Sequence, residues 1–266
     1  MNFKKLIACI MLCLFFNNNC YEPGPLPANW SLTFKAGVAP TLLTDRGAIA
    51  PVVCSSTPPV FTAACEQKFS DLWGNHPLTV GVDLAYAVAD YMEFFGEVDY
   101  RRTKAHTSCF TATQLGEEFG VITLHLDSFR AVGAYVGLRY FSCRYIYERM
   151  SFFVGSKLGL MHYQKVNACP LTFESPENNS IFDQNNLWFE ASTVVSGGLQ
   201  VGFDCLLTCR WSLFFNAEVV AGAAPKTAFN IIKQDELVLP DFTNIIHEQS
   251  GTLLAFPINL GLRFYF

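Results

Sequence analysis

The feature that most constrains this chain is the strict alternation of its last thirteen residues. Leu254, Phe256, Ile258, Leu260, Leu262, Phe264 and Phe266 alternate with Ala255, Pro257, Asn259, Gly261, Arg263 and Tyr265. A period of two places successive side chains on opposite faces of a β-strand. We therefore predict a closing strand with one apolar and one small or polar face. Pro257 cannot donate a ladder hydrogen bond, so it predicts a β-bulge there.

Seven earlier segments repeat this alternation: 29–39, 78–88, 92–101, 131–141, 152–163, 188–204 and 211–222. Their charged residues and that of the closing strand all fall on the polar face: Lys35, Asp83, Glu93, Glu97, Asp99, Arg101, Arg139, Lys157, Glu190, Asp204, Glu218 and Arg263. A soluble barrel or sandwich turns its apolar face inward, whereas a transmembrane barrel turns it toward lipid. The polar face is rich in Gly, Ala and Ser, which suits the crowded interior of a narrow barrel.

These segments predict an all-β fold, an antiparallel transmembrane β-barrel of eight strands. Ten strands is the alternative, because Phe119–Leu126 and Ile231–Ile246 also alternate. The connections are alternately long and short: 40–77, 102–128, 164–187 and 223–250 are long, and 89–91, 142–151 and 205–210 are short. Long external loops and short periplasmic turns are typical of transmembrane barrels.

The closing strand resembles the C-terminal strand of small Gram-negative outer-membrane β-barrel proteins of the eight-stranded type, which ends on an aromatic residue after an apolar ladder. The resemblance implies an assembly signal that the barrel-assembly machinery reads, formed here by Leu260, Leu262, Phe264 and Phe266. It also implies that outer-membrane lipid surrounds the barrel and that the protein is located in the cell outer membrane.

The first twenty residues have the pattern of a secretory signal. Lys4 and Lys5 precede an apolar run, Leu6–Phe16, that is too short to span a bilayer. We predict a signal peptide over 1–20, a Pro-rich periplasmic lead over 21–28, and the barrel over 29–266. Lipidation of Cys20 is the alternative, although Asn19 is not the small residue that precedes the cysteine of lipoproteins.

The mature chain is rich in cysteine. Cys54, Cys65, Cys109 and Cys169 fall in long loops, and Cys143, Cys205 and Cys209 in short turns. Export favours disulfides over metal binding. Cys205 and Cys209 bracket one turn and are predicted to pair. The cysteine content is similar to that of chlamydial major outer-membrane proteins, which implies bonds to other envelope proteins as an alternative to bonds within the loops.

The predicted lumen charges have two interpretations. Eight strands enclose a space just wide enough for side chains, so most of the charges should pair and fill it. The acidic residues Glu93, Glu97 and Asp99 could instead line a narrow cation path. The first interpretation predicts a closed barrel, and the second a small-solute porin.

Other chemistry is sparse. The net charge of −5 argues against a nucleic-acid partner. No cofactor, metal site or catalytic residue is predicted, although His125, Asp127 and Ser128 are residue types that lipid-modifying barrel enzymes use. The function we predict is structural or surface-interacting, through long disulfide-tied outer loops that contact other envelope proteins or a host or surface ligand. A small-solute porin and a lipid-directed enzyme are the alternatives.

Overall fold

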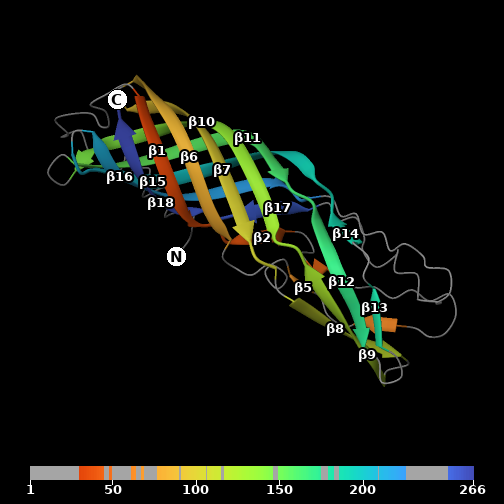
Figure 1. The fold of residues 1–266 in the computed structure, drawn as a ribbon. Coiled ribbons are helices and arrows are strands. Elements are labelled where there is room, and N and C mark those ends of the chain that lie inside the picture. The colour runs from red at the N-terminus through yellow and green to blue at the C-terminus, as the bar shows by residue number, and fades with distance from the viewer. Residues whose placement is uncertain are drawn as a thin grey trace, which may run out of the picture.

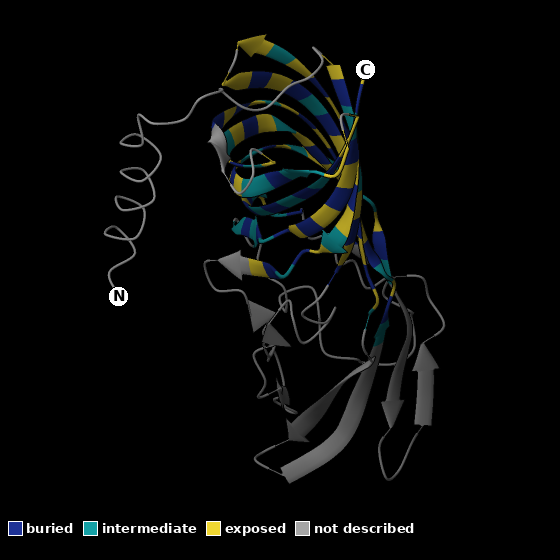
Figure 2. Ribbon diagram, turned by 90° about the vertical axis from the view of Figure 1, so that its left-hand side faces the viewer, coloured by how far each residue is buried: buried dark blue, intermediate teal, exposed yellow. Residues whose placement is uncertain are grey.

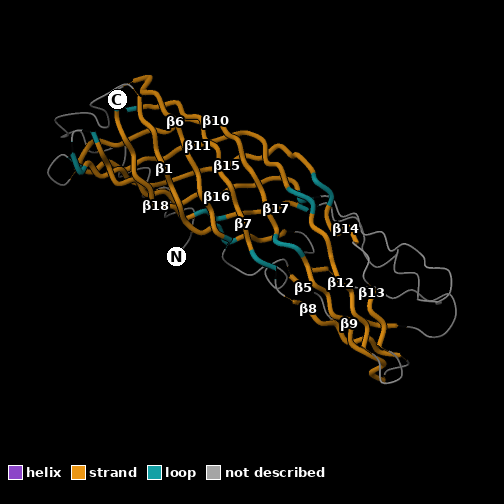
Figure 3. Tube along the Cα trace, viewed as in Figure 1, coloured by secondary structure: helices purple, strands orange, loops and turns teal. Residues whose placement is uncertain are grey.

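The computed structural model describes residues 30–44, 48–49, 61–63, 67–68, 77–89, 91–105, 107–114, 117–145, 149–174, 179–182, 186–208, 210–225 and 251–266 of the chain. In these ranges the backbone forms strands, turns and extended connections, and the fold is all-β (Figure 3). The described residues include no helix that is long and apolar enough to cross a membrane.

Eight long strands form a closed antiparallel barrel (Figure 1). They are β1 (Trp30–Val38), β6 (Leu78–Ala89), β7 (Met92–Thr103), β10 (Phe129–Tyr145), β11 (Met150–Tyr163), β15 (Ser192–Leu206), β16 (Trp211–Ala223) and β18 (Ile258–Tyr265). Each pairs with the next one in this order, and β18 returns to β1 with Tyr265 opposite Ser31. The closed ladder leaves no barrel edge unpaired, as a membrane interior requires. The prediction of eight strands rather than ten is confirmed.

The barrel turns its apolar face outward, as Figure 2 shows by the alternating bands of burial. In β6, Leu78, Val80 and Leu84 are 59%, 42% and 43% exposed, whereas Thr79 and Asp83 are buried. The apolar positions of β6 run from Leu78 to Val88, which is about 33 Å along the strand at ~3.3 Å per residue. A strand tilt of ~40° reduces this to about 25 Å along the barrel axis, which matches the apolar band of outer-membrane barrels.

Pro40, after the end of β1, and Pro257, before the start of β18, interrupt the barrel wall without changing the register of its strands. The short strands β2 (Thr41–Thr44) and β17 (Thr252–Ala255) continue β1 and β18 past these interruptions. Along β16, Ala217 lies opposite Ile258 and Val220 opposite Ala255, so the two strands advance by the same number of residues. The predicted bulge at Pro257 is therefore wrong. Pro257 still accepts a 2.8 Å hydrogen bond from the backbone N of Glu218, so the missing donor costs the ladder one bond only.

The long connections contain strands of their own, which is the main departure from the predicted loops. They are β3 (Ala48–Ile49), β4 (Phe61–Ala63), β5 (Gln67–Lys68), β8 (Thr107–Gln114), β9 (Glu117–Leu126), β12 (Val166–Glu174), β13 (Asn179–Phe182) and β14 (Asn186–Phe189). The order β13-β12-β9-β8-β4 defines a second sheet, with β14 also on β12, and β3 pairs with β5. We call this second sheet the outer sheet. It projects from the long-loop end of the barrel (Figure 1).

The predicted extra strands fall outside the barrel. Phe119–Leu126 lies within β9, which pairs with β8 and β12 instead of joining the barrel wall. The segment 231–246 lies outside the described residues.

Candidate functional site

The barrel lumen gathers most of the charged residues that the alternation predicts to face it. Eleven of them are at most 5% exposed and lie on the inward face: Lys35, Asp83, Glu93, Glu97, Asp99, Arg101, Arg139, Lys157, Asp204, Glu218 and Arg263. The five cations and six carboxylates nearly offset one another. Charges in a low-dielectric interior are tolerated only where they are paired and hydrogen-bonded, so their pairing determines what the lumen can do.

Glu190 is the exception and corrects the predicted set. It is exposed and belongs to no strand. The segment 188–204 was predicted as one strand, but β14 ends at Phe189 within the outer sheet and β15 begins at Ser192 in the barrel. Because Glu190 lies in the short connection between two sheets, its place in the alternation does not direct it into the lumen.

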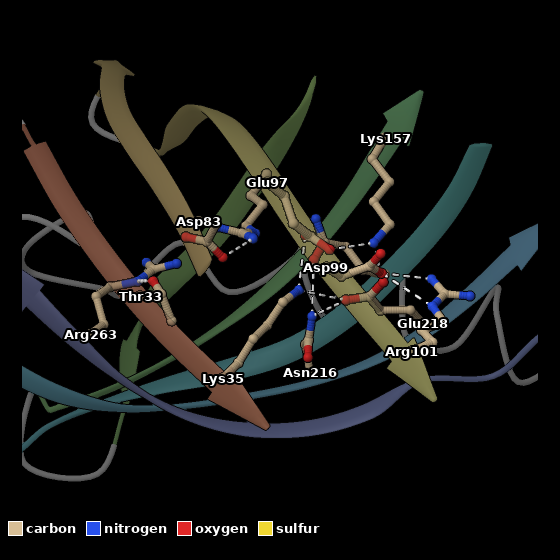
Figure 4. Close-up of polar contacts among 12 residues, drawn as sticks. Thr33, Lys35, Asp83, Glu97, Asp99, Arg101, Lys157, Asn216, Glu218 and Arg263 are labelled. Atoms are coloured by element: carbon tan, nitrogen blue, oxygen red, sulfur yellow. Dashed lines mark hydrogen bonds and ion pairs between the residues drawn. The ribbon is translucent and has the colours of Figure 1, made fainter. Parts of the chain in front are cut away.

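The part of the lumen near the short turns is organised by two arginines. Arg139 of β10 donates from Nη2 to Asp83 Oδ2 at 2.8 Å and from Nη1 to Glu93 Oε1 at 2.7 Å. Arg263 of β18 reaches the same Glu93 carboxylate at 3.2 Å. Its Nε also donates to Thr33 Oγ1 at 3.1 Å (Figure 4). Its Nη1 lies 3.8 Å from Asp204. Three of these contacts, Arg139 to Asp83 and Arg263 to Glu93 and Asp204, join strands that do not neighbour each other in the wall. The two arginines therefore cross-link the barrel through its interior.

Aromatic rings fill the space around both guanidinium groups. Phe141, Phe153 and Phe214 form one buried cluster, with ring centroids of Phe153 and Phe214 5.1 Å apart. The Arg139 guanidinium carbon lies 3.8 Å from the centroid of Phe95, and that of Arg263 lies 4.4 Å from Phe214. Cation–π contacts of this kind are strongest where water is excluded. The short-turn end of the lumen is therefore closed by packed rings and cations.

These inward rings were missed as site residues, but the sequence contains a signal for them. Three of the inward rings, Phe95, Phe153 and Phe214, each lie next to a second Phe in the sequence, in the pairs 94–95, 152–153 and 214–215. In an alternating strand, two adjacent aromatic residues must place one ring on each face. Phe94 and Phe152 are exposed on the outer wall, whereas Phe95 and Phe153 are buried inside.

A second charged cluster lies farther toward the long-loop end. Lys35 contacts Glu97 at 2.9 Å and Glu218 at 3.0 Å, and Lys157 contacts Glu97 at 2.7 Å as well as Glu218 (Figure 4). The two lysines and two glutamates thus form a closed ring of four ion pairs contributed by four strands. Beside it, Arg101 is held by Asp99 at 2.7 Å.

Neutral polar residues that the sequence reasoning did not select complete this cluster. Asn216 donates to Glu218 Oε1, and Ser196 donates to the Tyr135 hydroxyl at 3.1 Å. The Lys157 ammonium lies 4.4 Å from the centroid of the Tyr135 ring. In the part of the chain that the structure describes, the lumen therefore holds charged and polar side chains that are bonded to one another across the barrel.

The predicted cysteine arrangement is partly corrected. Cys109, Cys143, Cys169 and Cys205 lie inside β8, β10, β12 and β15 rather than in loops or turns, because the ladders continue past the apolar segments. Cys205 is free in the structure, and its predicted partner, Cys209, lies outside the described residues. Cys54, Cys65 and Cys209 lie outside the described residues.

The predicted assembly signal lies on the lipid-facing wall. Leu260, Leu262 and Phe266 are exposed, and the Phe264 ring lies 4.8 Å from Trp211 and 6.0 Å from Phe266. Aromatic pairs recur at this short-turn end, where Trp30 lies 4.8 Å from Tyr86. Rings at this level are typical of an interfacial girdle.

The residues considered for catalysis lie at the opposite rim. Asp127 and Ser128 line an outer hollow of about 430 Å³ together with Arg130 and His162. Asp127 accepts a hydrogen bond from Asn167 Nδ2 at 3.1 Å, and His162 Nδ1 lies 2.9 Å from Thr193 Oγ1. The described residues contain no group of His, Cys, Asp and Glu side chains that could hold a metal ion.

An outward apolar wall, an inward paired-charge lumen and a closed antiparallel ladder together define a transmembrane β-barrel. No known protein family and no curated protein sequence matches the chain. The chain is similar to the solved structure of Neisserial surface protein A, with 10% sequence identity and a TM-score of 0.45 over 89% of this chain and 97% of that chain. It is similar to Ail of Yersinia pestis in complex with the heparin analogue sucrose octasulfate, with 11% identity and a TM-score of 0.37 over 89% of this chain and 99% of that chain. It is also similar to the outer membrane protein OprG of Pseudomonas aeruginosa, with 14% identity and a TM-score of 0.37 over 90% of this chain and 98% of that chain.

Proposed function

We propose that this protein is an exported outer-membrane barrel that does not conduct, and that it anchors the outer sheet at the cell surface, where the sheet contacts other envelope proteins or external ligands. The observation that carries the proposal is the filled lumen. Its cations and carboxylates are buried and paired with one another, and the rings around Arg139 and Arg263 close its short-turn end.

The same observation disfavours the porin alternative. A cation passing Glu97 or Glu218 would have to displace Lys35 and Lys157, each of which contacts both carboxylates. Breaking a buried ion pair in this way costs about 3–5 kcal/mol because one charge is left unpaired. A barrel of eight strands offers no second route, since its interior is only wide enough for side chains.

The outer sheet supports a surface-contact role. Strands β8, β9 and β12 continue the chain of the barrel strands β7, β10 and β11, so a paired sheet rather than three separate loops projects from the wall. Sheets with exposed edges are suited to contacts with other chains, because their backbone groups remain free to pair.

Disulfides that tie the outer segments are part of the proposal. Cys109 of β8 and Cys169 of β12 lie on opposite sides of β9. Two strand spacings separate them by about 9.6 Å, and a disulfide requires Cα atoms within roughly 7 Å. The two therefore do not pair directly, and bonds of each to Cys54 or Cys65, or to a neighbouring protein, are proposed instead.

Conductance in a planar bilayer tests the closed barrel. The purified protein should give no stepwise current at any salt concentration. The variant F95A/F153A/F214A keeps the ion pairs of Lys35 and Lys157 with Glu97 and Glu218 and should remain closed, whereas a variant that also carries K35A/K157A should conduct intermittently. Salt-dependent steps from the unaltered protein would establish the porin alternative.

A second measurement tests the role of the outer sheet. Cell envelopes that contain the full chain should show higher-mass species on non-reducing gels that disappear on reduction. A variant lacking 107–125, which removes the β8–β9 hairpin and with it Cys109, should lose part of these species but retain the heat-dependent gel mobility of a folded barrel. Identical gels with and without reductant would contradict disulfide contact with other envelope proteins.

A further inference from the structure

A group of cations lies on the outward face at the long-loop rim, just above the apolar band. Arg102 of β7 and Arg130 of β10 are exposed, as are Lys104, which follows the end of β7, and Lys165, which lies between β11 and β12. We call Arg102, Lys104, Arg130 and Lys165 the rim cluster. In the part of the chain that the structure describes, none of the four makes an ion pair. Asp127 is the acidic residue that shares the adjoining hollow with Arg130 and Lys165.

The two arginines are direct cross-strand partners. Arg130 lies opposite Arg102 in the β7–β10 ladder, and both side chains point away from the lumen. Like charges directly opposite one another destabilise a sheet. An anion bound between them would remove this repulsion, and the planar guanidinium groups are suited to bidentate contact with phosphate.

The position of the rim cluster on the wall indicates what carries the anion. The next outward-facing pair toward the barrel centre is Tyr100 opposite Val132, and Val98 opposite Ala134 follows. A ligand that contacts the arginines therefore has apolar surface directly below its charge. This arrangement fits an amphiphile whose phosphate lies at the rim and whose acyl chains lie along the wall.

The two ends of the barrel differ in the way a lipid site would require. At the short-turn end the apolar band finishes in aromatic residues, including Trp30, Tyr86 and Trp211. At the long-loop end of β7 and β10 it finishes in arginines. Aromatic residues suit any membrane interface, whereas a row of cations selects an anionic headgroup.

We propose that the rim cluster binds a phosphorylated lipid headgroup of the outer leaflet, with Arg102 and Arg130 sharing one phosphate. The hollow of about 430 Å³ beside Arg130, lined also by Ser128, His162 and Gln164, provides polar contacts for the rest of the headgroup. This inference rests on the proposed outer-membrane location, because only that orientation places the long-loop rim in the outer leaflet.

The test uses the full chain in zwitterionic detergent micelles and measures binding of diphosphoryl lipid A by native mass spectrometry. The variant R102Q/R130Q is compared with R149Q/R210Q, which removes two exposed arginines from the short-turn end. Each basic residue near an anionic headgroup contributes about fivefold to binding, so R102Q/R130Q should bind about 25-fold more weakly while R149Q/R210Q should match the unaltered protein. Equal binding by all three proteins would overturn the proposal.

Further arms identify the source of the phosphate. The same lipid with its phosphates removed should bind all three proteins weakly, and raising the salt concentration should weaken only the binding of the phosphorylated lipid. If millimolar inorganic phosphate displaces the lipid fully, the site recognises a free anion and the lipid proposal fails. Failure of the chain to form a heat-modifiable barrel in detergent would instead refute the outer-membrane function itself.

Discussion

Replacing Arg139 by Met is the sharpest test of the claim that lumen charges hold this barrel together. Arg139 is fully buried and donates to Asp83 and to Glu93. After the change, Glu93 keeps its contact with Arg263 at 3.2 Å, but Asp83 loses the cation that bonds it. The defect should therefore be concentrated on one buried carboxylate.

The magnitude follows from these contacts. Removing one member of a buried ion pair costs about 3–5 kcal/mol. Since Arg263 still compensates Glu93, we expect the lower half of this range, about 3–4 kcal/mol. The lost cation–π contact on Phe95 adds about 2 kcal/mol, because both groups are buried. The change R139M should thus lower the free energy of unfolding by about 5–6 kcal/mol. Adding Asp83→Asn removes the stranded charge and should restore about 2 kcal/mol.

Reversible urea unfolding in lipid vesicles, followed by tryptophan fluorescence and heat-dependent gel mobility, measures these differences. The variant R149M is the matched control, because Arg149 is exposed at a short turn and its loss should change stability by less than about 0.5 kcal/mol. The reasoning is refuted if R139M costs less than about 1 kcal/mol, or if D83N destabilises the R139M protein as much as it destabilises the unaltered one.

Three further outcomes are expected. Gly137→Ala places a Cβ against the backbone oxygen of Ser156 and 2.6 Å from the Phe95 ring, so it should cost about 1–3 kcal/mol in the same urea assay. Gly96→Ala, where a Cβ meets nothing within 4 Å, should leave stability unchanged. Equal effects of the two changes would contradict the packed lumen. Phe266→Ala should lower the amount of barrel in the outer membrane of cells while leaving refolding in detergent unchanged; normal cellular levels would refute its role as an assembly signal. Glu190→Gln should alter the free energy of unfolding by less than about 0.5 kcal/mol, because the side chain is exposed. A large loss of stability would indicate instead that Glu190 lies in the lumen.

Much of the lumen was predictable because the side-chain period of a strand is two. Once one residue of a strand is known to face inward, every second residue follows, and Asp83, Arg139 and Arg263 were placed in this way. Glu190 was misplaced because alternation cannot show where one strand ends and another begins. The same rule predicts that Phe152 and Phe153 face opposite sides of the wall, since adjacent side chains of a strand point to opposite faces.

Pro257 shows a different limit. A proline removes one donor, and the sequence alone suggested that the ladder responds with a bulge. The structure keeps the register because Pro40 interrupts the neighbouring strand at the same level, and Phe256 N donates to Pro40 O at 2.8 Å. Pro40 and Pro257, more than 200 positions apart in the chain, thus interrupt neighbouring strands at the same level, and no local sequence pattern predicts such a pairing.

The sequence by itself determined the strands of the barrel and the face that each turns to lipid, because alternation is a local property of the extended backbone. The tertiary structure decided which charges meet: Lys35 and Lys157 bridge Glu97 and Glu218 only after the wall has closed. It also decided that parts of three long connections, 40–77, 102–128 and 164–187, form the outer sheet, and that Arg102 lies opposite Arg130 at the rim. These features depend on contacts between distant strands, whose register is established by the whole barrel.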